Sequence, residues 1–255
     1  MDIQGQENQL ILAFPDREVR CLDTADNRIN RMLERSNISI IGNNNRVLLH
    51  FESEDSAEEL LTGAGFLLIV KGDGNEVDMG TVIVRCSSIL GMTGLKLIIG
   101  QLPGLGAGVS RTANGCSVTI GDRVVINGVT LYLQEDHSRR QRQMCIRDSV
   151  SIGDDSQLSW GVDVWCTDAH TITDLEGNPV NYAESIEIGR HVWVGKDVKI
   201  GKNVRIADNS IVGWGSIVTK RFDEPNVILA GTPAKIVKRG INWDRKCINK
   251  YAKGL

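Results

Sequence analysis

The stretch Ile188–Lys220, which reads IGRHVWVGKDVKIGKNVRIADNSIVGWGSIVTK, repeats itself every six residues. Each copy has an aliphatic residue followed by a small one, and in the first five copies a valine or serine stands four positions after the aliphatic. The aliphatic positions are Ile188, Val194, Ile200, Ile206, Val212 and Val218. A helix repeats every 3.6 residues and a strand every two, so neither explains this spacing. We interpret each hexapeptide as one flat side of a coil, whose aliphatic residue points inward and whose small residue lets the chain turn the corner.

Three such sides would close a triangular turn of about 18 residues, and stacked turns would bury the aliphatic residues in one column. The same phase appears upstream at Ile152, Leu158 and Val164. It lapses between Val164 and Ile188, which predicts a loop that leaves the coil there. Before residue 139 the pattern is weaker, and we expect irregular coils of the same solenoid.

The segment Arg139–Ser149, RRQRQMCIRDS, differs from its glycine-rich and β-branched surroundings. A basic run of this kind is often a solvated loop or a nucleic-acid patch. We favour a third interpretation, because the segment matches in order the translation of an adapter oligonucleotide used in transposase-based sequencing libraries. The sequence therefore predicts an adapter-derived insertion at 139–149.

These patterns divide the chain into five parts. They are an N-terminal segment (1–35), irregular coils (36–138), the insertion (139–149), a regular β-helix (150–220) with a loop at 168–185, and a C-terminal cap (221–255). Within the first part, RINRMLER predicts a short amphipathic helix between residues 20 and 35. The cap should cover the open edge of the column.

Composition sets the class of protein. Charged residues make up 24% and apolar residues 41% of the 255 residues, as in an ordinary globular protein. The net charge of −3 argues against general attraction to nucleic acid or anionic membranes. The apolar run at Phe66–Val70 is too short to span a bilayer, and the N-terminus does not read as a signal peptide, so we expect a cytoplasmic protein. Six cysteines without a CxxC pair predict free thiols.

Together with NVILAGTPAKIVK at 226–238, the repeat resembles the hexapeptide-repeat acyltransferases. Within them it resembles the acetyl-CoA-dependent O-acetyltransferases that modify sugars of surface polysaccharides such as capsule and O-antigen. The resemblance implies an all-β fold, a left-handed parallel β-helix with an irregular N-terminal portion and a C-terminal cap. It also implies a homotrimer that uses acetyl-CoA as co-substrate and needs no metal.

Acetyl transfer to a sugar needs a base, because a hydroxyl is a poor nucleophile. His170, in CTDAHTITD, matches the family's catalytic histidine, and an imidazole titrates near neutral pH. Asp168 or Asp163 could orient its ring, although either could be a turn residue instead. His191 is the second candidate base, with a structural or substrate-contacting role more expected.

The resemblance also implies contacts to the substrates. The positions that match the cofactor site are Trp193, Gly195, Lys196, Trp214, Thr219, Lys220, Lys235 and Lys238. Trp214 departs from the alanine that relatives commonly have, and each lysine could equally be a solvated surface residue. The side chains available to a sugar acceptor are Asp174, Asn178, Asn181, Tyr182 and His191.

The sequence is compatible with several other functions. Relatives on the same fold acetylate serine, maltose-type sugars, galactosides or chloramphenicol-like drugs. A β-solenoid can also be a scaffold without catalysis. The γ-type carbonic anhydrases share the solenoid but bind zinc through three histidines, and the four histidines of this chain include no pair at ligand spacing.

Overall fold

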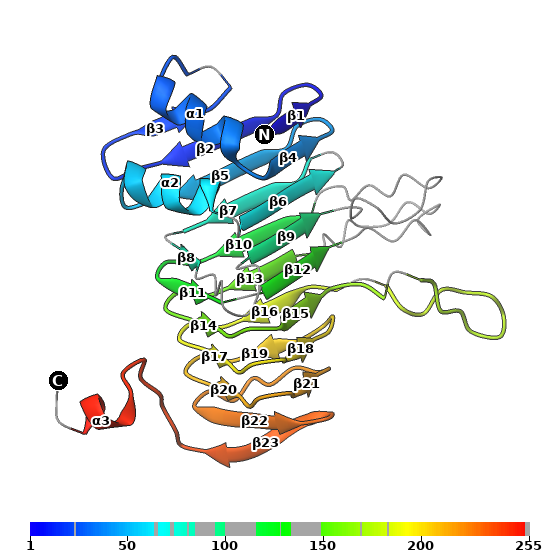
Figure 1. Cartoon of the computed structure of the whole chain (residues 1–255). Coiled ribbons are helices and arrows are strands. Elements are labelled where there is room, and N and C mark those ends of the chain that lie inside the picture. The colour runs from blue at the N-terminus through cyan, green and yellow to red at the C-terminus, as the bar shows by residue number, and fades with distance from the viewer. Residues whose placement is uncertain are drawn as a thin grey trace.

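The computed structural model describes residues 1–22, 24–63, 66–71, 74–80, 82–84, 95–99, 116–127, 129–133, 149–168, 170–182 and 184–252. The described strands form three sheets that wind around one axis from the N-terminal to the C-terminal end (Figure 1). The first sheet contains β1 (Asp2–Gln4), β4 (Ile38–Ile41), β6 (Phe66–Lys71), β9 (Leu95–Ile99), β12 (Val129–Leu133), β15 (Val162–Trp165), β18 (Lys199–Ile200) and β21 (Ile217–Val218).

The second sheet contains β3 (Glu18–Arg20), β2 (Gln9–Ala13), β5 (Arg46–His50), β7 (Glu76–Met79), β10 (Ser117–Ile120), β13 (Ser149–Ile152), β16 (Ile186–Ile188) and β19 (Arg205–Ile206). The third sheet contains β8 (Val82–Val84), β11 (Val124–Ile126), β14 (Gln157–Leu158), β17 (Trp193–Val194), β20 (Ile211–Val212), β22 (Val227–Gly231) and β23 (Ala234–Arg239). All pairings between successive turns are parallel, and only β2–β3 and β22–β23 are antiparallel among the described strands. The predicted all-β parallel β-helix is therefore confirmed.

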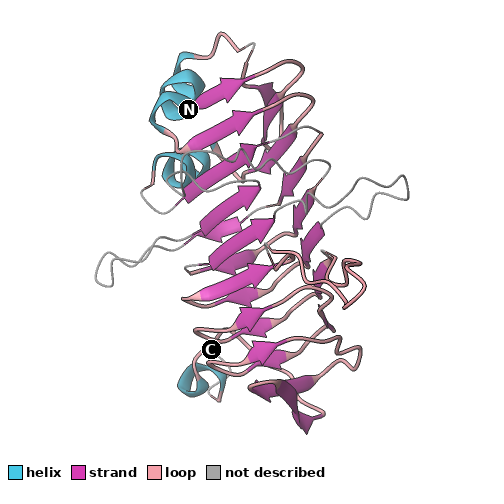
Figure 2. Ribbon diagram, turned by 90° about the vertical axis from the view of Figure 1, so that its right-hand side faces the viewer, coloured by secondary structure: helices cyan, strands magenta, loops and turns pink. Residues whose placement is uncertain are grey.

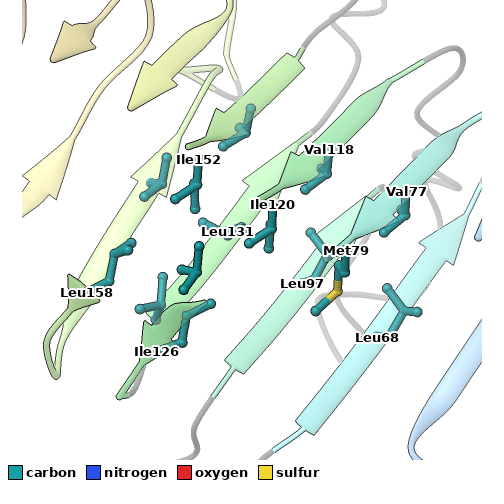
Figure 3. Close-up of a cluster of buried hydrophobic side chains, with 14 of the residues drawn as sticks. Leu68, Val77, Met79, Leu97, Val118, Ile120, Ile126, Leu131, Ile152 and Leu158 are labelled. Carbon is teal, nitrogen blue, oxygen red and sulfur yellow. The ribbon is translucent and has the colours of Figure 1, made fainter. Parts of the chain in front are cut away.

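The strand register places the aliphatic residue of each hexapeptide directly over that of the next turn. Ile152 pairs with Ile188 in the second sheet, and Leu158 pairs with Val194 in the third. The side chains so aligned are at most 2% exposed and form one continuous column. Figure 3 shows part of this column, where side chains from neighbouring strands such as Val118, Ile120 and Ile152 gather on one face. Burial of such residues is the main stabilising contribution in this fold.

The corners of the coil correct one detail of the sequence interpretation. The residue with positive φ stands three positions after the inward aliphatic, as at His191, Asp197 and Asn203. The small residue directly after the aliphatic has another role. A Cβ at Gly153 would lie 2.7 Å from backbone atoms of the adjacent turn. The small residue therefore lets turns approach closely, while the later residue makes the bend.

Two helices lie at the N-terminal end of the solenoid (Figure 2). Helix α1 (Asn27–Arg35) begins at Asp26, whose side chain accepts hydrogen bonds from two backbone N–H groups of the first turn, and it buries three apolar residues. This confirms the helix expected between residues 20 and 35. Helix α2 (Glu54–Thr62) begins with a capping box at Ser53 and was not predicted.

A ladder of buried asparagines supports the irregular N-terminal turns. Asn8 Oδ1 accepts from the side chain of Asn45 at 3.0 Å, and Asn45 Oδ1 accepts from that of Asn75 at 2.9 Å. Asn75 Oδ1 in turn accepts from the backbone N–H of Cys116 at 3.0 Å. Each amide thereby satisfies buried polar groups of the next turn.

The predicted insertion lies between β12 and β13. Residues 139–148 are outside the described residues, so the adapter interpretation remains a prediction. On either side, Ile120 of β10 pairs directly with Ile152 of β13. The two strands therefore belong to successive turns, and the buried column continues in phase past the segment.

The C-terminal part begins after the last regular turn. The antiparallel hairpin of β22 and β23 adds to the third sheet and covers the end of the column. From there the chain runs to the short helix α3 (Ile248–Tyr251) (Figure 1). None of the helices that the structure describes is long and apolar enough to span a bilayer.

Candidate active site

His170 lies on the loop that joins β15 to β16 and projects from the solenoid (Figure 1). The hexapeptide pattern lapses over this stretch, and its described large apolar residues, Ile172, Leu175 and Val180, are exposed. The side chain of His170 is exposed, and its ring makes no hydrogen bond or ion pair with any described residue. An imidazole in this setting is open to a substrate hydroxyl.

The base of the loop is tied by Asn181 and Lys202. Asn181 Nδ2 donates to the backbone O of His170 and to Asp168 Oδ2, each at 2.8 Å. Asn181 Oδ1 accepts from the backbone N–H of Ile172 at 2.7 Å. Lys202 Nζ donates to Asp168 Oδ2 at 2.6 Å and to the backbone O of Asn181 at 2.9 Å. The loop on both sides of His170 is thus connected to the regular coil.

Asp168 contacts Lys202 and Asn181, whereas a carboxylate that orients the His170 ring would have to contact that ring. No hydrogen bond joins Asp168 to the His170 ring within the described chain. Burial works to raise the pKa of Asp168, but the hydrogen bonds from Lys202 and Asn181 outweigh it and lower the pKa. Asp163, the other candidate, forms an ion pair with Lys199.

His191 is held on both ring nitrogens. Its Nδ1 lies 2.7 Å from Asp155 Oδ2, and its Nε2 lies 3.0 Å from the backbone O of Trp243. Arg245 also pairs with Asp155, and it donates to the backbone O of Ser156 at 3.2 Å. With neither nitrogen open to a substrate, this geometry favours the structural role for His191.

The remaining residues predicted to contact the acceptor differ in their availability. Both carboxylate oxygens of Asp174 accept hydrogen bonds from Asn178, at 2.7 and 3.0 Å, and these bonds lower the pKa of Asp174. Asp174 therefore closes a turn within the loop. Tyr182 is exposed and stands beside Asn181 at the end of the loop.

The residues predicted to contact the cofactor follow one another along the third sheet. Trp193 lies in β17, Trp214 follows β20 in the next turn, and Lys235 and Lys238 lie in β23 at the end of the same sheet. The indoles of Trp193 and Trp214 are 38% and 72% exposed, and both lysines are exposed. The sheet thus presents aromatic faces followed by cations.

Neighbouring residues shape this face. Lys196 Nζ lies 5.3 Å from the centre of the Trp214 ring, and the indole N–H of Trp214 donates to Asp197 at 3.3 Å. Gly195 is buried, and a Cβ there would lie 2.8 Å from the backbone O of Val212. Gly195 is therefore required for packing between turns, whatever else it contacts.

Thr219 and Lys220 stand apart from that row. Both follow β21 of the first sheet and are exposed. Lys220 Nζ lies over the ring of Phe222, 5.3 Å from its centre. The structure therefore distributes the predicted residues over different sides of the coil, with His170 on the loop after β15 of the first sheet.

Sequence reasoning missed Lys202, Trp243, Arg245 and Asp155. Lys202 occupies the second position after an inward aliphatic, where lysine and arginine also occur in other copies of the repeat. Trp243 and Arg245 belong to a tail without periodicity. In each case a partner lies far away in the sequence: 34 residues separate Lys202 from Asp168, 52 separate Trp243 from His191, and 90 separate Arg245 from Asp155.

The three coiled parallel sheets around one buried column form a hexapeptide-repeat β-helix. No known family profile matches the chain. The chain is 33% identical over 190 residues to the polysialic acid O-acetyltransferase of Neisseria meningitidis, covering 73% of this chain and 82% of that protein. The chain therefore belongs to the hexapeptide-repeat O-acetyltransferases that include this enzyme.

A second relative is the polysialic acid O-acetyltransferase of Escherichia coli O1:K1, 30% identical over 178 residues. The match covers 65% of this chain and 47% of the relative, so the chain spans about half the length of that protein. Two crystal structures share the fold. The polySia specific acetyltransferase NeuO matches with a TM-score of 0.64 at 23% identity, covering 100% of this chain and 97% of that one. The polysialic acid O-acetyltransferase OatWY matches with a TM-score of 0.53 at 21% identity, covering 97% of this chain and 92% of that one.

Proposed function

We propose that this chain moves the acetyl group of acetyl-CoA to a sugar hydroxyl of a surface polysaccharide, with His170 as the general base. The observation that carries the proposal is the His170 side chain, which is exposed on a tethered loop and whose ring nitrogens make no hydrogen bond within the described part of the chain. Membership of the O-acetyltransferase family supports the reaction class, and the names of the two relatives make polysialic acid the first acceptor to test.

The reaction requires one proton to be taken and returned. A ring nitrogen of His170 accepts the proton of the sugar hydroxyl as its oxygen bonds to the thioester carbonyl carbon. The tetrahedral intermediate then collapses with cleavage of the carbon–sulfur bond. The imidazolium returns the proton to the departing sulfur, which leaves an acetyl ester, free CoA and a neutral ring.

The third sheet fits acetyl-CoA as co-substrate. The exposed face of Trp193 suits the acetyl and pantetheine end, and Trp214 with Lys196 continues the same face. The ammonium groups of Lys235 and Lys238 suit the nucleotide phosphates, because cations are the expected partners of phosphate oxygens. Thr219 and Lys220 follow the first sheet, and we propose that they contact the same co-substrate from that side of the coil.

A homotrimer would bring these parts together. His170 belongs to a loop after the first sheet, whereas Trp193 and Lys235 belong to the third sheet of the same chain. We propose that the His170 loop of one chain faces the third sheet of its neighbour. Two variants, each expected to be inactive alone, test this arrangement. Mixed trimers of His170→Ala and Trp193→Ala chains should recover activity, because some sites would contain neither substitution. No recovery from mixed trimers would place the site within one chain.

The acceptor is tested by measuring free CoA released from acetyl-CoA with a panel of sugars. The panel contains oligomers of sialic acid, maltose, a galactoside, serine and chloramphenicol. We expect release that depends on the sialic acid oligomers, and the mass of the product should increase by one acetyl group. Release with another acceptor alone would keep the reaction class and change the substrate. If a folded chain neither binds acetyl-CoA nor releases CoA, it is a non-catalytic scaffold.

A further inference from the structure

We propose that Asn181 and Lys202 are positioning residues that hold His170 at the correct place for catalysis, with Asp168 as their anchor. This inference rests on the proposed role of His170. It reassigns Asn181, which the sequence placed among the acceptor contacts, and Asp168, which it placed beside the imidazole.

The side-chain amide of Asn181 holds the backbone on both sides of His170. Its Nδ2 donates to the His170 backbone O at 2.8 Å, and its Oδ1 accepts from the Ile172 backbone N–H at 2.7 Å. The second hydrogen of Nδ2 points to Asp168 Oδ2. Both amide hydrogens and one oxygen lone pair are therefore used within the loop, which leaves the amide little capacity for a sugar hydroxyl.

Lys202 connects this arrangement to the rigid coil. It stands two residues after the end of β18 at a corner of the next turn, and its Nζ bridges Asp168 Oδ2 and the backbone O of Asn181. Its side chain is 21% exposed, compared with 48% for Lys199, which forms an ordinary surface ion pair on the same sheet. Hydrogen bonds between charged partners at this degree of burial are stronger than those between neutral groups.

The catalytic consequence follows from the geometry that a general base needs. The ring nitrogen must come within about 2.6–3.2 Å of the hydroxyl oxygen. Besides the contacts of Asn181, the described part of the loop near His170 is held by a hydrogen bond from the backbone N–H of Val180 to the backbone O of Ile172 at 2.9 Å. A displacement of about 1 Å can reduce turnover by about 100-fold. Loss of the contacts made by Asn181 and Lys202 should thus reduce kcat without removing any group that touches acetyl-CoA.

The test compares Lys202→Met and Asn181→Ala with the wild-type chain, and uses Lys199→Met as the matched control. Lys202→Arg retains the charge and donors. We expect kcat to fall about 10- to 100-fold in the first two variants, while KM for acetyl-CoA changes less than about twofold. Lys202→Arg should recover most of kcat, and Lys199→Met should match the wild type.

Amide hydrogen exchange supplies a readout that does not depend on turnover. The Ile172 N–H should exchange faster in Asn181→Ala and Lys202→Met than in the wild type and Lys199→Met. Unchanged exchange at Ile172 in both variants overturns the positioning role, whatever the activity. A higher KM for the sugar at constant kcat in Asn181→Ala would also overturn it, because that result would mean that Asn181 contacts the acceptor. Failure of the proposed function looks different, because either the wild-type chain would then release no CoA or His170→Ala would release it at the wild-type rate.

Discussion

The indole of Trp243 stacks on the imidazole of His191, with ring centroids 4.3 Å apart and planes inclined by 10°. The indole N–H donates to the backbone O of His191 at 2.7 Å, and His191 Nε2 lies 3.0 Å from the backbone O of Trp243. The rings thus fasten the C-terminal tail to a corner of the β-helix. The Trp243 ring also lies 5.9 Å from that of Trp193, on the sheet proposed to bind acetyl-CoA.

Removal of this ring should loosen the tail. We expect Trp243→Ala to reduce the free energy of unfolding by about 1–3 kcal/mol, because one aromatic contact and one hydrogen bond are lost. Trp243→Phe retains the stacking but lacks the donor, so its free energy of unfolding should lie between those of the wild type and Trp243→Ala. Urea unfolding measures the difference. Equal stability of Trp243→Ala and the wild type would show that the tail is not fastened here.

The Asp155 carboxylate should make the free energy of unfolding depend on pH. Burial works to raise the pKa of Asp155, but the hydrogen bonds from Arg245 and His191 outweigh it and lower the pKa below the ordinary aspartate value of 3.8. A carboxyl with a lowered folded-state pKa stabilises the fold above the ordinary value, and this contribution is lost as pH falls through the lowered one. Asp155→Asn should therefore lose less stability than the wild type between about pH 6 and about pH 3. Parallel losses in urea unfolding would contradict this.

Close approach of successive turns should make Gly153 sensitive to a methyl group. A Cβ there would lie 2.7 Å from the backbone N of Arg190, whereas a Cβ at Gly201 would meet its nearest atom at 3.7 Å. We expect Gly153→Ala to cost about 1–3 kcal/mol through overpacking and Gly201→Ala to cost less than about 0.5 kcal/mol. Thermal unfolding of the two variants tests the pair, and similar losses would refute the packing role of Gly153.

The corner at Asn203 should tolerate glycine and reject a β-branched residue. Its φ is 56°, a left-handed conformation that asparagine and glycine adopt readily. We expect Asn203→Val to destabilise the protein by about 1–2 kcal/mol and Asn203→Gly by much less. A Val variant as stable as the Gly variant would mean that the corner adopts another conformation.

Deletion of residues 139–148 should leave the β-helix intact. Strand β12 ends at Leu133 and β13 begins at Ser149, and five residues would still connect them. A shorter connection costs less closure entropy, so we expect the free energy of unfolding to stay constant or rise by about 1 kcal/mol. Loss of cooperative unfolding would show that these residues belong to the fold. Amplification of the gene from its source tests the adapter interpretation itself.

The hexapeptide pattern predicted the β-helix and the buried column, because inward residues such as Ile188 and Val194 are determined by local spacing. It also predicted that the coil is interrupted where His170 lies. The pattern did not reveal the asparagine ladder, the partners of Asp168 or the stacking of Trp243. Each depends on which residues of separate turns face one another. Loops of unequal length between turns change the sequence distance between facing residues, so the pairs cannot be found from the repeat. His191 illustrates the difference, since its place at a corner follows from the repeat but its partners do not.

The most direct test of the account is the rate of sugar-dependent CoA release by the wild-type chain and by His170→Ala, with both proteins shown to unfold cooperatively. The exposed His170 ring makes no hydrogen bond or ion pair with any residue that the structure describes, so the substitution should leave stability unchanged. We predict that release falls at least about 100-fold in His170→Ala, while acetyl-CoA still binds. Release at the wild-type rate by the folded variant would show that His170 is not the base.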